Sequence, residues 1–571
     1  MTKNLKKNKE ITIKTPLRKA STVMKLSRLG SFHQSRLSFT RQLINEMKQK
    51  EWEFYIAEWN IDNEGLGNAV INVKAKKDIF SLVAFCHDIK NEERSDRVIA
   101  EKWDMTFSLF KGHPSKEEVR HMSENLKVQE LGRHLPKQLT LSRANKSVRI
   151  FSNIINSLAN GQQPDRNIIN DIGYLVRTTA VYGNGKFGIG DFSKISKGSF
   201  LKNPFQAEML TVYLIRFFSI NLINFLSEMK GGEKAIKLSN DISRHIGVGN
   251  ATGLGMAPFL VNHQELLHKW INTKEIALSR VFSLHTLTIS EQNYILDLIE
   301  QAHKYTLQWK VDDEVQSTKI KKITNDLINI LNDQNTKIIL NQTYPLKKLK
   351  DNFINTISIE TEEMLHSIFL EPFSNIIEDL TNEMSVKEVN TVSINFDVSE
   401  IIEMINKNYS WALNIDIEKE DENFYFWYTS QAKLEPRLGL QKIDKGIEKA
   451  LPFDIPHQIQ KAKKILESLP SKMSGSEAML KNPEIRNIIR RVIINKTSPY
   501  SEIQDNLIGS NTKPIDMLRC KLSFFGASKY DPKSNLWTRI TLFQGAPLPH
   551  QLQEKNSCDW LFPYLNLIKN I

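Results

Sequence analysis

The sequence predicts an α+β protein that is predominantly helical, with short antiparallel β meanders or hairpins near the N-terminus and in the C-terminal third. Three observations lead to this prediction. Strand-like runs rich in β-branched and aromatic residues come early, helical periodicity dominates the middle, and two further strand pairs come late. Hydrophobic residues make up 40% of the 571 positions and charged residues 25%, which is typical of a globular chain.

The early strands follow a helical pattern over residues 32–48. Residues 52–59, 69–75 and 79–86 are rich in β-branched and aromatic residues, and turn-forming residues separate them. These runs predict a three-stranded antiparallel meander.

Helical periodicity extends from about residue 96 to residue 334, with breaks at short segments that contain glycine and proline. One helix start is clear, because Thr288 and Glu291 have the spacing of a capping box. A polar stretch around 333–350 is the predicted linker.

Two strand pairs are predicted beyond the linker. The first joins 411–418 to 423–429, and the second joins 518–524 to 536–543. Side chains alternate along a strand, so the second hairpin would have one apolar and one basic face. The basic face would carry Arg519, Lys521 and Arg539.

The elements suggest four segments along the chain. They are a basic flexible tail at 1–30, an α+β domain at 31–130, a helical domain at 131–335 and an α+β domain at 350–571. The tail holds nine Lys or Arg and one Glu, which gives +8 of the net charge of +12. The remaining +4 is spread over 541 residues, which argues against nucleic-acid binding beyond non-specific contact by the tail.

The cellular compartment is inferred from cysteines and apolar runs. Three scattered cysteines do not form a disulfide framework, so the sequence favours a reducing, cytoplasmic location. The basic N-terminus lacks the apolar run of a secretory signal. The longest apolar stretch, 209–226, contains Arg216 and is interpreted as a buried helix and not as a membrane span.

Two glycine-rich loops are the main candidates for ligand binding. Eight of the 24 glycines fall in G-N-G-K-F-G-I-G (183–190) and G-V-G-N-A-T-G-L-G (247–255). Glycine lets the backbone turn tightly or approach a ligand, and exposed N–H groups bind anions. Kinase motifs do not accompany the first loop, and a helical pattern before the second disfavours a dinucleotide fold. Long turns between helices are the alternative interpretation.

Polar side chains near these loops supply a candidate site. The hypothesis is a soluble enzyme that binds a small carboxylate or phosphate, with no defined reaction or cofactor. The acid–base candidates are Tyr182 and His263. The candidate ligand-binding residues are Arg177, Asn184, Lys186, Asn250, Asn262, Arg143 and Lys146. Arg143 and Lys146 precede an apolar helical run, whose N-terminus would favour an anion. Helix capping and solvated charges are the alternative roles for these two residues.

Two other functions are compatible with the sequence. Glu265 with His268, and Glu300 with His303, have the i, i+3 spacing that carboxylate-bridged di-iron bundles use, which would make the protein a metal-dependent oxidase. Surface pairing explains the same spacing without a metal. A non-catalytic interaction protein is the third hypothesis, and the oligomeric state does not follow from the sequence.

Three motifs resemble those of a family of bacterial proteins of similar length to which no activity is assigned. They are L-V-R-T-T-A-V-Y-G-N-G-K-F-G, I-G-V-G-N-A-T-G-L-G-M-A-P-F and D-M-L-R-C-K-L-S-F-F-G-A-S-K-Y-D-P-K. The resemblance extends over most of the chain beyond the basic tail. It implies a bacterial cytoplasmic protein and assigns no functional residue.

Overall fold

The fold was analysed in a computed structural model of the whole chain. The structure describes residues 15–87, 103–124, 135–182, 195–196, 198–250, 263–384, 395–416, 427–430, 436–438, 450–452, 455–504, 514–532, 538–555, 557–563 and 565. It is an α+β protein in which helices predominate, as the sequence predicts.

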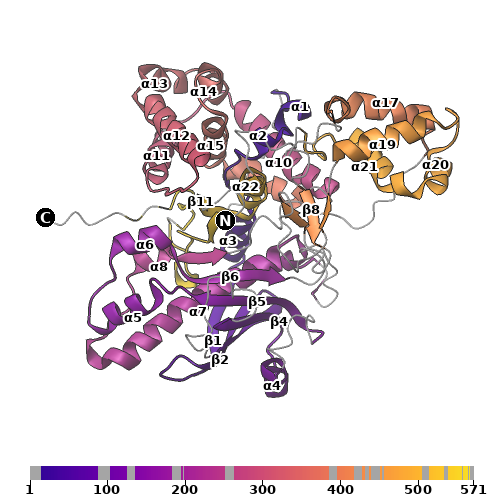
Figure 1. Cartoon of the computed structure of the whole chain (residues 1–571). Coiled ribbons are helices and arrows are strands. Elements are labelled where there is room, and N and C mark those ends of the chain that lie inside the picture. Colours follow the sequence, from indigo (N-terminus) through magenta and orange to yellow (C-terminus); the bar gives the residue numbers. More distant parts are fainter. Residues whose placement is uncertain are drawn as a thin grey trace, which may run out of the picture.

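A nine-stranded sheet forms the centre of the fold (Figure 1). Its strand order is β1-β2-β3-β4-β5-β6-β7-β12-β11, and neighbouring strands are antiparallel except for β6 and β7. The strands are β1 (Glu53–Ile61), β2 (Gly67–Ala75), β3 (Asp78–Cys86), β4 (Met105–Lys111), β5 (Gln138–Lys146), β6 (Tyr174–Tyr182), β7 (Gly247–Asn250), β11 (Ala527–Pro532) and β12 (Thr538–Leu542). The three segments suggested as separate domains therefore all contribute strands to one sheet.

The predicted N-terminal meander is confirmed. Strand β2 pairs with β1 from Glu53↔Lys74 to Ile61↔Gly67, and with β3 from Gly67↔Cys86 to Ala75↔Asp78. The helix predicted ahead of it is α3 (Phe39–Gln49), which begins several residues later than the periodicity indicates. A second small sheet has the order β10-β8-β9, with β8 (Trp427–Ser430), β9 (Pro436–Leu438) and β10 (Ala450–Pro452).

Strands β4 to β7 lie where the sequence predicts helices. Apolar and polar residues do not alternate along these strands as they do in a sheet with one solvent-exposed face. Both faces are largely covered, and in β4 the residues from Met105 to Phe110 are all buried. A short apolar run that is buried on both faces cannot be assigned to strand or helix by its period alone. The prediction of a helical region from 96 to 334 is wrong for these segments.

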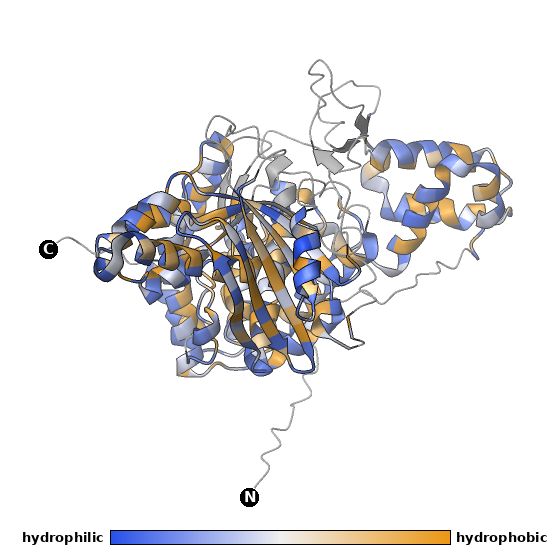
Figure 2. Cartoon of the chain, turned by 90° about the horizontal axis from the view of Figure 1, so that it is seen from below, coloured by the Kyte–Doolittle hydropathy of each residue, from blue (hydrophilic) through white to orange (hydrophobic). Residues whose placement is uncertain are grey.

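The long helix α7 (Gln206–Gly231) covers one face of the sheet. The hydroxyl of Thr211 lies 2.7 Å from that of Thr140 in β5, and the ring of Phe218 packs on Phe107 of β4. We call this the inner face. The opposite, outer face is crossed by α4 (Lys116–Glu124), whose Met122 packs on Val83 and Phe85 of β3 (Figure 2).

Helix α7 is the one described segment that is long and apolar enough to cross a membrane. However, 78% of its apolar stretch is buried against the rest of the protein, as in the core helix of a soluble fold. Its Arg216 is buried and donates to the carbonyl oxygens of Arg244 and Ala546, at 2.8 Å and 2.7 Å. This agrees with the interpretation of 209–226 as a buried helix.

The remaining helices form a set near the sheet, two distal groups that Figure 1 separates, and a set between those groups. Near the sheet lie α5 (Phe151–Ala159), α6 (Arg166–Ile172) and α8 (Asn240–His245). One distal group contains α11 (Ile289–Thr306), α12 (Glu314–Asn332), α13 (Gln334–Leu340), α14 (Pro345–Phe353), α15 (Ile359–Leu370) and α16 (Ser374–Ile377). The other contains α17 (Val398–Asn408), α18 (Ser410–Leu413), α19 (Ile455–Glu467), α20 (Gly475–Lys481) and α21 (Arg486–Thr497). Between the groups lie α1 (Ala20–Val23), α2 (Leu26–Leu29), α10 (Gln264–Phe282) and α22 (Pro514–Phe525).

The capping box at the start of α11 is confirmed. The backbone N–H of Glu291 donates to the Thr288 hydroxyl at 3.2 Å, and that of Thr288 donates to the Glu291 carboxylate at 2.7 Å. The polar stretch expected as a linker forms α13 and α14, whose apolar residues Leu340, Leu346 and Leu349 are buried in the core.

Two of the predicted C-terminal strands are helices. Residues 410–413 form α18. Residues 518–524 belong to α22, because Leu518, Leu522 and Phe525 also have the spacing of one face of a helix. The hairpin pairs β11 with β12 instead. Arg519 accordingly lies on a helix and is only 4% exposed, whereas the side chains of Lys521 and Arg539 lie outside the described residues. The basic hairpin face is therefore not formed as predicted.

The described part of the basic segment also differs from a flexible tail. Residues 15–30 contain α1 and α2, and Val23, Met24, Leu26 and Leu29 are at most 1% exposed. Gln504 is tied to this segment, because its N–H donates to the carbonyl of Met24 at 2.7 Å. Apolar residues between the basic ones anchor the segment in the core.

Candidate functional site

The two glycine-rich segments begin on neighbouring strands. β6 and β7 run parallel, with Arg177 opposite Gly249 and Thr178 opposite Asn250. Segment 183–190 begins directly after β6, and the second glycine-rich segment starts within β7 and continues beyond Asn250. Carboxyl ends of parallel neighbours meet at one edge of a sheet, so both segments leave the sheet at that edge. Strand β6 thus precedes the first segment, whereas helix α8 precedes the second, as the helical pattern before it indicates.

Two of the glycines are required by packing within the sheet. A Cβ on Gly249 would lie 2.8 Å from the ring of Tyr174, and one on Gly247 would overlap the carbonyl oxygen of Leu542. Close strand contact therefore explains these two glycines without any ligand.

Arg143 and Arg177 lie on the same face of the sheet. Residues two apart in a strand share a face, so Arg143 and Asn145 of β5 point to the same side. Arg177 of β6 is directly opposite Asn145, and so it shares that side. Thr140, which is three residues before Arg143, contacts α7, so the side of the two arginines is the outer face.

The two arginines have different surroundings. Arg143 is 9% exposed, and its guanidinium lies over the indole of Trp103 at 4.4 Å from the ring centroid. Arg177 is half-buried, and within the described part of the chain its side chain has no hydrogen bond or ion pair. A buried acid, Asp104, lies at the C-terminal end of β5, where it accepts a hydrogen bond from the backbone N–H of Lys146 at 2.8 Å. The outer face thus presents two cations, Arg143 and Arg177.

Two of the predicted ligand-binding residues point elsewhere. Asn250 donates to the hydroxyl of Thr178 at 3.1 Å, and Thr178 follows Arg177, so this pair lies on the inner face. Lys146 is opposite Val176, toward the amino end of β6, and its ammonium group lies 5.4 Å from the centroid of the Phe151 ring. Arg177 and Asn250 therefore do not converge, although they are on adjacent strands.

Several predicted residues fall outside the described part. Asn184 and Lys186 belong to 183–194, and Asn262 belongs to 251–262. Tyr182 is the last residue of β6, and only its backbone is described. His263 is half-buried at the N-cap of α10, directly after the segment that follows β7.

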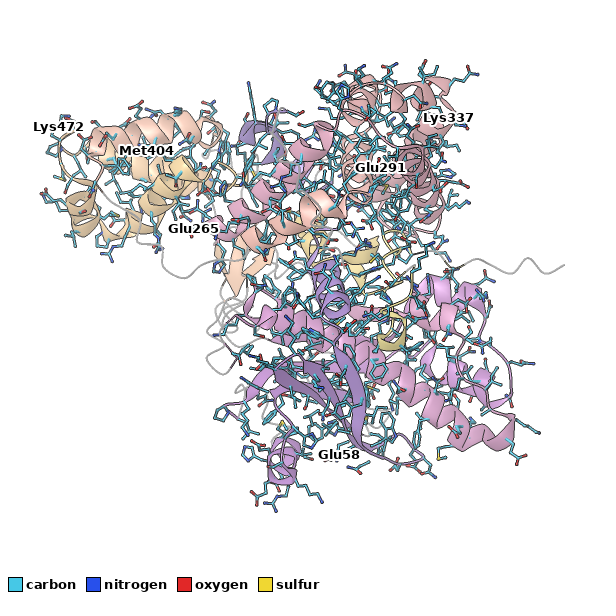
Figure 3. All side chains as sticks on the ribbon, turned by 180° about the vertical axis from the view of Figure 1, so that it is seen from behind. Glu58, Glu265, Glu291, Lys337, Met404 and Lys472 are labelled. Carbon is cyan, nitrogen blue, oxygen red and sulfur yellow. The ribbon has the colours of Figure 1, made fainter. Side chains whose placement is uncertain are left out.

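Two of the four alternative metal residues are engaged in other contacts. His268 Nδ1 accepts a hydrogen bond from the Tyr500 N–H at 3.2 Å, and exposed Glu300 pairs with Lys304 at 2.6 Å. In Figure 3, Glu265 lies beside the helical group that carries Met404 and Lys472, whereas Glu291 of α11 lies in the other group. Among the described residues, no three His, Cys, Asp or Glu side chains come together as a metal site.

Sequence reasoning missed a buried cluster of charged residues between the N-terminal segment, α10 and α15, which we call the Glu363 cluster. The Glu363 carboxylate accepts from Arg18 at 2.6 Å, from Arg28 at 2.9 Å and from Lys274 at 2.6 Å. The full cluster consists of Arg18, Arg28, Lys274, Glu275, Glu362 and Glu363. Burial would raise the pKa of Glu363, but Arg18 and Lys274 hold it well below its usual value.

The Glu363 cluster balances three cations with three carboxylates, and this balance favours a role in holding the N-terminal segment. His366 lies beside it, with Nδ1 3.4 Å from the Glu363 carboxylate, and burial lowers the pKa of this histidine. The sequence signal was present as Glu363 and His366 at i, i+3 spacing. The basic partners could not be located, because Arg18 and Arg28 are over three hundred residues away in the chain and Lys274 is 89 residues away.

Comparison with known proteins gives no relative. No protein-family model, no curated protein and no solved structure matches the chain.

Proposed function

We propose that the protein is a soluble enzyme that binds a small anionic ligand, a carboxylate or a phosphate, on the outer face of the sheet at the carboxyl edge of β6 and β7. The observation that carries this proposal is that Arg143 and Arg177 lie on one face of adjacent strands, beside the edge where both glycine-rich segments leave the sheet. In open sheets, ligands commonly bind outside the carboxyl ends of parallel strands.

The chemistry of the two arginines suits an anion. A guanidinium presents a planar set of N–H donors that matches the oxygens of carboxylate and phosphate. Trp103 covers one side of Arg143 and excludes water there, which strengthens an electrostatic contact. Arg177 is partly exposed and so is accessible to a ligand from solution.

The acid–base candidates of this enzyme are Tyr182 and His263. Tyr182 ends β6, and His263 precedes α10 after the segment that follows β7, so both belong to the connections at the carboxyl edge. Backbone N–H groups of the glycine-rich segments would add donors for the anion.

Calorimetric titration tests the ligand class. The wild-type protein is titrated with inorganic phosphate and, separately, with a small dicarboxylate. We expect at least one of these anions to bind, and the Arg177→Met variant to bind it roughly 10- to 100-fold more weakly, because a charged hydrogen bond contributes about 1.5–3 kcal/mol.

Arg149→Met is the matched control. Arg149 is exposed and follows β5, whose C-terminal end lies toward the amino end of β6, away from the proposed site. Its loss should leave anion affinity within about twofold, because a distant, solvated charge is largely screened. Equal affinity in Arg177→Met and in the wild-type protein would contradict the proposal.

A further inference from the structure

A small pocket, partly open to solvent, lies beside β11, the strand at one end of the nine-stranded sheet. It has a volume of about 30 Å³. Its walls come from the segment before α3, the end of α11, α22, β11 and the C-terminal segment, and they include Phe32, His33, Gln34, Trp309, Arg519 and Ser528. Because a water molecule needs about 10–15 Å³ of such volume, the pocket has room for about two.

Buried polar atoms without a hydrogen-bond partner within the described structure include, among the lining residues, Nε2 of His33, Oε1 of Gln34 and Nε1 of Trp309. The Gln34 amide nitrogen donates to the carbonyl of Leu561 at 2.8 Å, which leaves the amide oxygen as its unpaired end. Buried polar groups in native proteins nearly always have partners, so these atoms indicate a bound molecule.

The unpaired atoms define the chemistry of that molecule. The indole N–H of Trp309 can only donate, and the Gln34 oxygen can only accept, so the ligand must both accept and donate. An anion would meet the Gln34 oxygen, and a cation would meet Arg519 and the indole N–H. Neither charged species therefore fits. Burial, with Arg519 and Lys274 nearby, holds the pKa of His33 well below its usual value, so the imidazole is neutral and offers Nε2 in either role.

We infer that this pocket binds a neutral hydroxyl group, which accepts a hydrogen bond from Trp309 Nε1–H and donates one to Gln34 Oε1, with His33 Nε2 as its third partner. The hydroxyl belongs to ordered water or to the end of a small alcohol or polyol. Its place is fixed by aromatic walls: the rings of His33 and Trp309 stack with centroids 6.1 Å apart. The inference is independent of the proposed anion site.

A high-resolution crystal structure of the protein as purified tests the inference. Isolated density peaks within hydrogen-bonding distance of Trp309 Nε1 and Gln34 Oε1 would identify water, and continuous density would identify an organic hydroxyl. Both results support a hydroxyl site. An empty pocket, or a peak with the anomalous signal of a halide or a metal, overturns the inference.

Nuclear Overhauser spectroscopy of the Trp309 indole proton gives a second test in solution. We expect a cross-peak to water or to a ligand proton in the wild-type protein, and its absence would overturn the inference. Gln34→Leu should lose at least half of that cross-peak intensity, because the acceptor is gone. Gln301→Leu, at an exposed position of α11, is the control and should retain it. An unchanged cross-peak in folded Gln34→Leu also counts against the inference.

Discussion

Replacing Glu363 by Gln tests whether the buried cluster anchors the N-terminal segment. Three cations, Arg18, Arg28 and Lys274, contact the Glu363 carboxylate, which is fully buried. The substitution keeps the size of the side chain and removes one negative charge, so three buried cations would face two carboxylates. Removing one partner of a buried ion pair costs about 3–5 kcal/mol, and we expect the free energy of unfolding to fall by that amount.

Equilibrium denaturation in urea, followed by tryptophan fluorescence, measures this loss. Glu300→Gln is the matched control: Glu300 pairs with Lys304 one turn away on the exposed face of α11. We expect this control to lose less than about 0.5 kcal/mol. The double variant Glu363→Gln with Lys274→Met restores the charge balance, so its loss should be smaller than the sum of the two single losses. A loss below about 1 kcal/mol for Glu363→Gln, or additive single losses, would refute the reasoning.

Three other perturbations have definite expected outcomes. Burial and Lys269 lower the pKa of His268 to about 4, so between pH 6.5 and 4 the unfolded chain binds a proton that the folded chain does not. The free energy of unfolding should therefore fall as the pH falls through this window. In urea titrations at each pH, His268→Gln should show a shallower dependence of this free energy on pH. Arg216→Met removes the hydrogen bonds that the guanidinium donates to the buried carbonyls of Ser243, Ile246 and Ala546. We expect a loss of at least about 3 kcal/mol in thermal unfolding, since each buried group left unpaired costs about 1–3 kcal/mol; a shift in Tm of under a degree would contradict this. Gly249→Ala forces a methyl group against Tyr174 and should cost about 1–3 kcal/mol by chemical denaturation, whereas wild-type stability would show that the strands can separate freely.

The sequence predicted elements whose pattern reflects one dominant environment. In β1 to β3 the β-branched and aromatic content and the intervening turns were sufficient, and the Thr288 capping box is a purely local signal. The pattern failed for β4, where Met105 to Phe110 are all buried, so apolar and polar residues are not divided between a buried and an exposed face. It failed again for α22, because the spacing of Leu518, Leu522 and Phe525 fits a helix while the alternation of the same segment fits a strand.

The candidate site could be predicted only in part for a related reason. The residue types and the glycine clusters are visible in the sequence, but the sharing of a face by Arg143 and Arg177 depends on the register of β5 against β6. The register of β6 against β7 places Asn250 opposite Thr178, and so on the other face of the sheet from Arg177. The partners of Arg18 were inaccessible to local reasoning, since Glu363 follows 345 residues later.

The most direct test of the anion site is a crystal structure of the wild-type protein soaked in selenate, a phosphate-like anion whose selenium is located by anomalous scattering. The proposal expects a selenium peak in contact with the guanidinium groups of Arg143 and Arg177, beside the carboxyl edge of β6 and β7. Selenium peaks confined to other basic surfaces, with none at these two arginines, would contradict it.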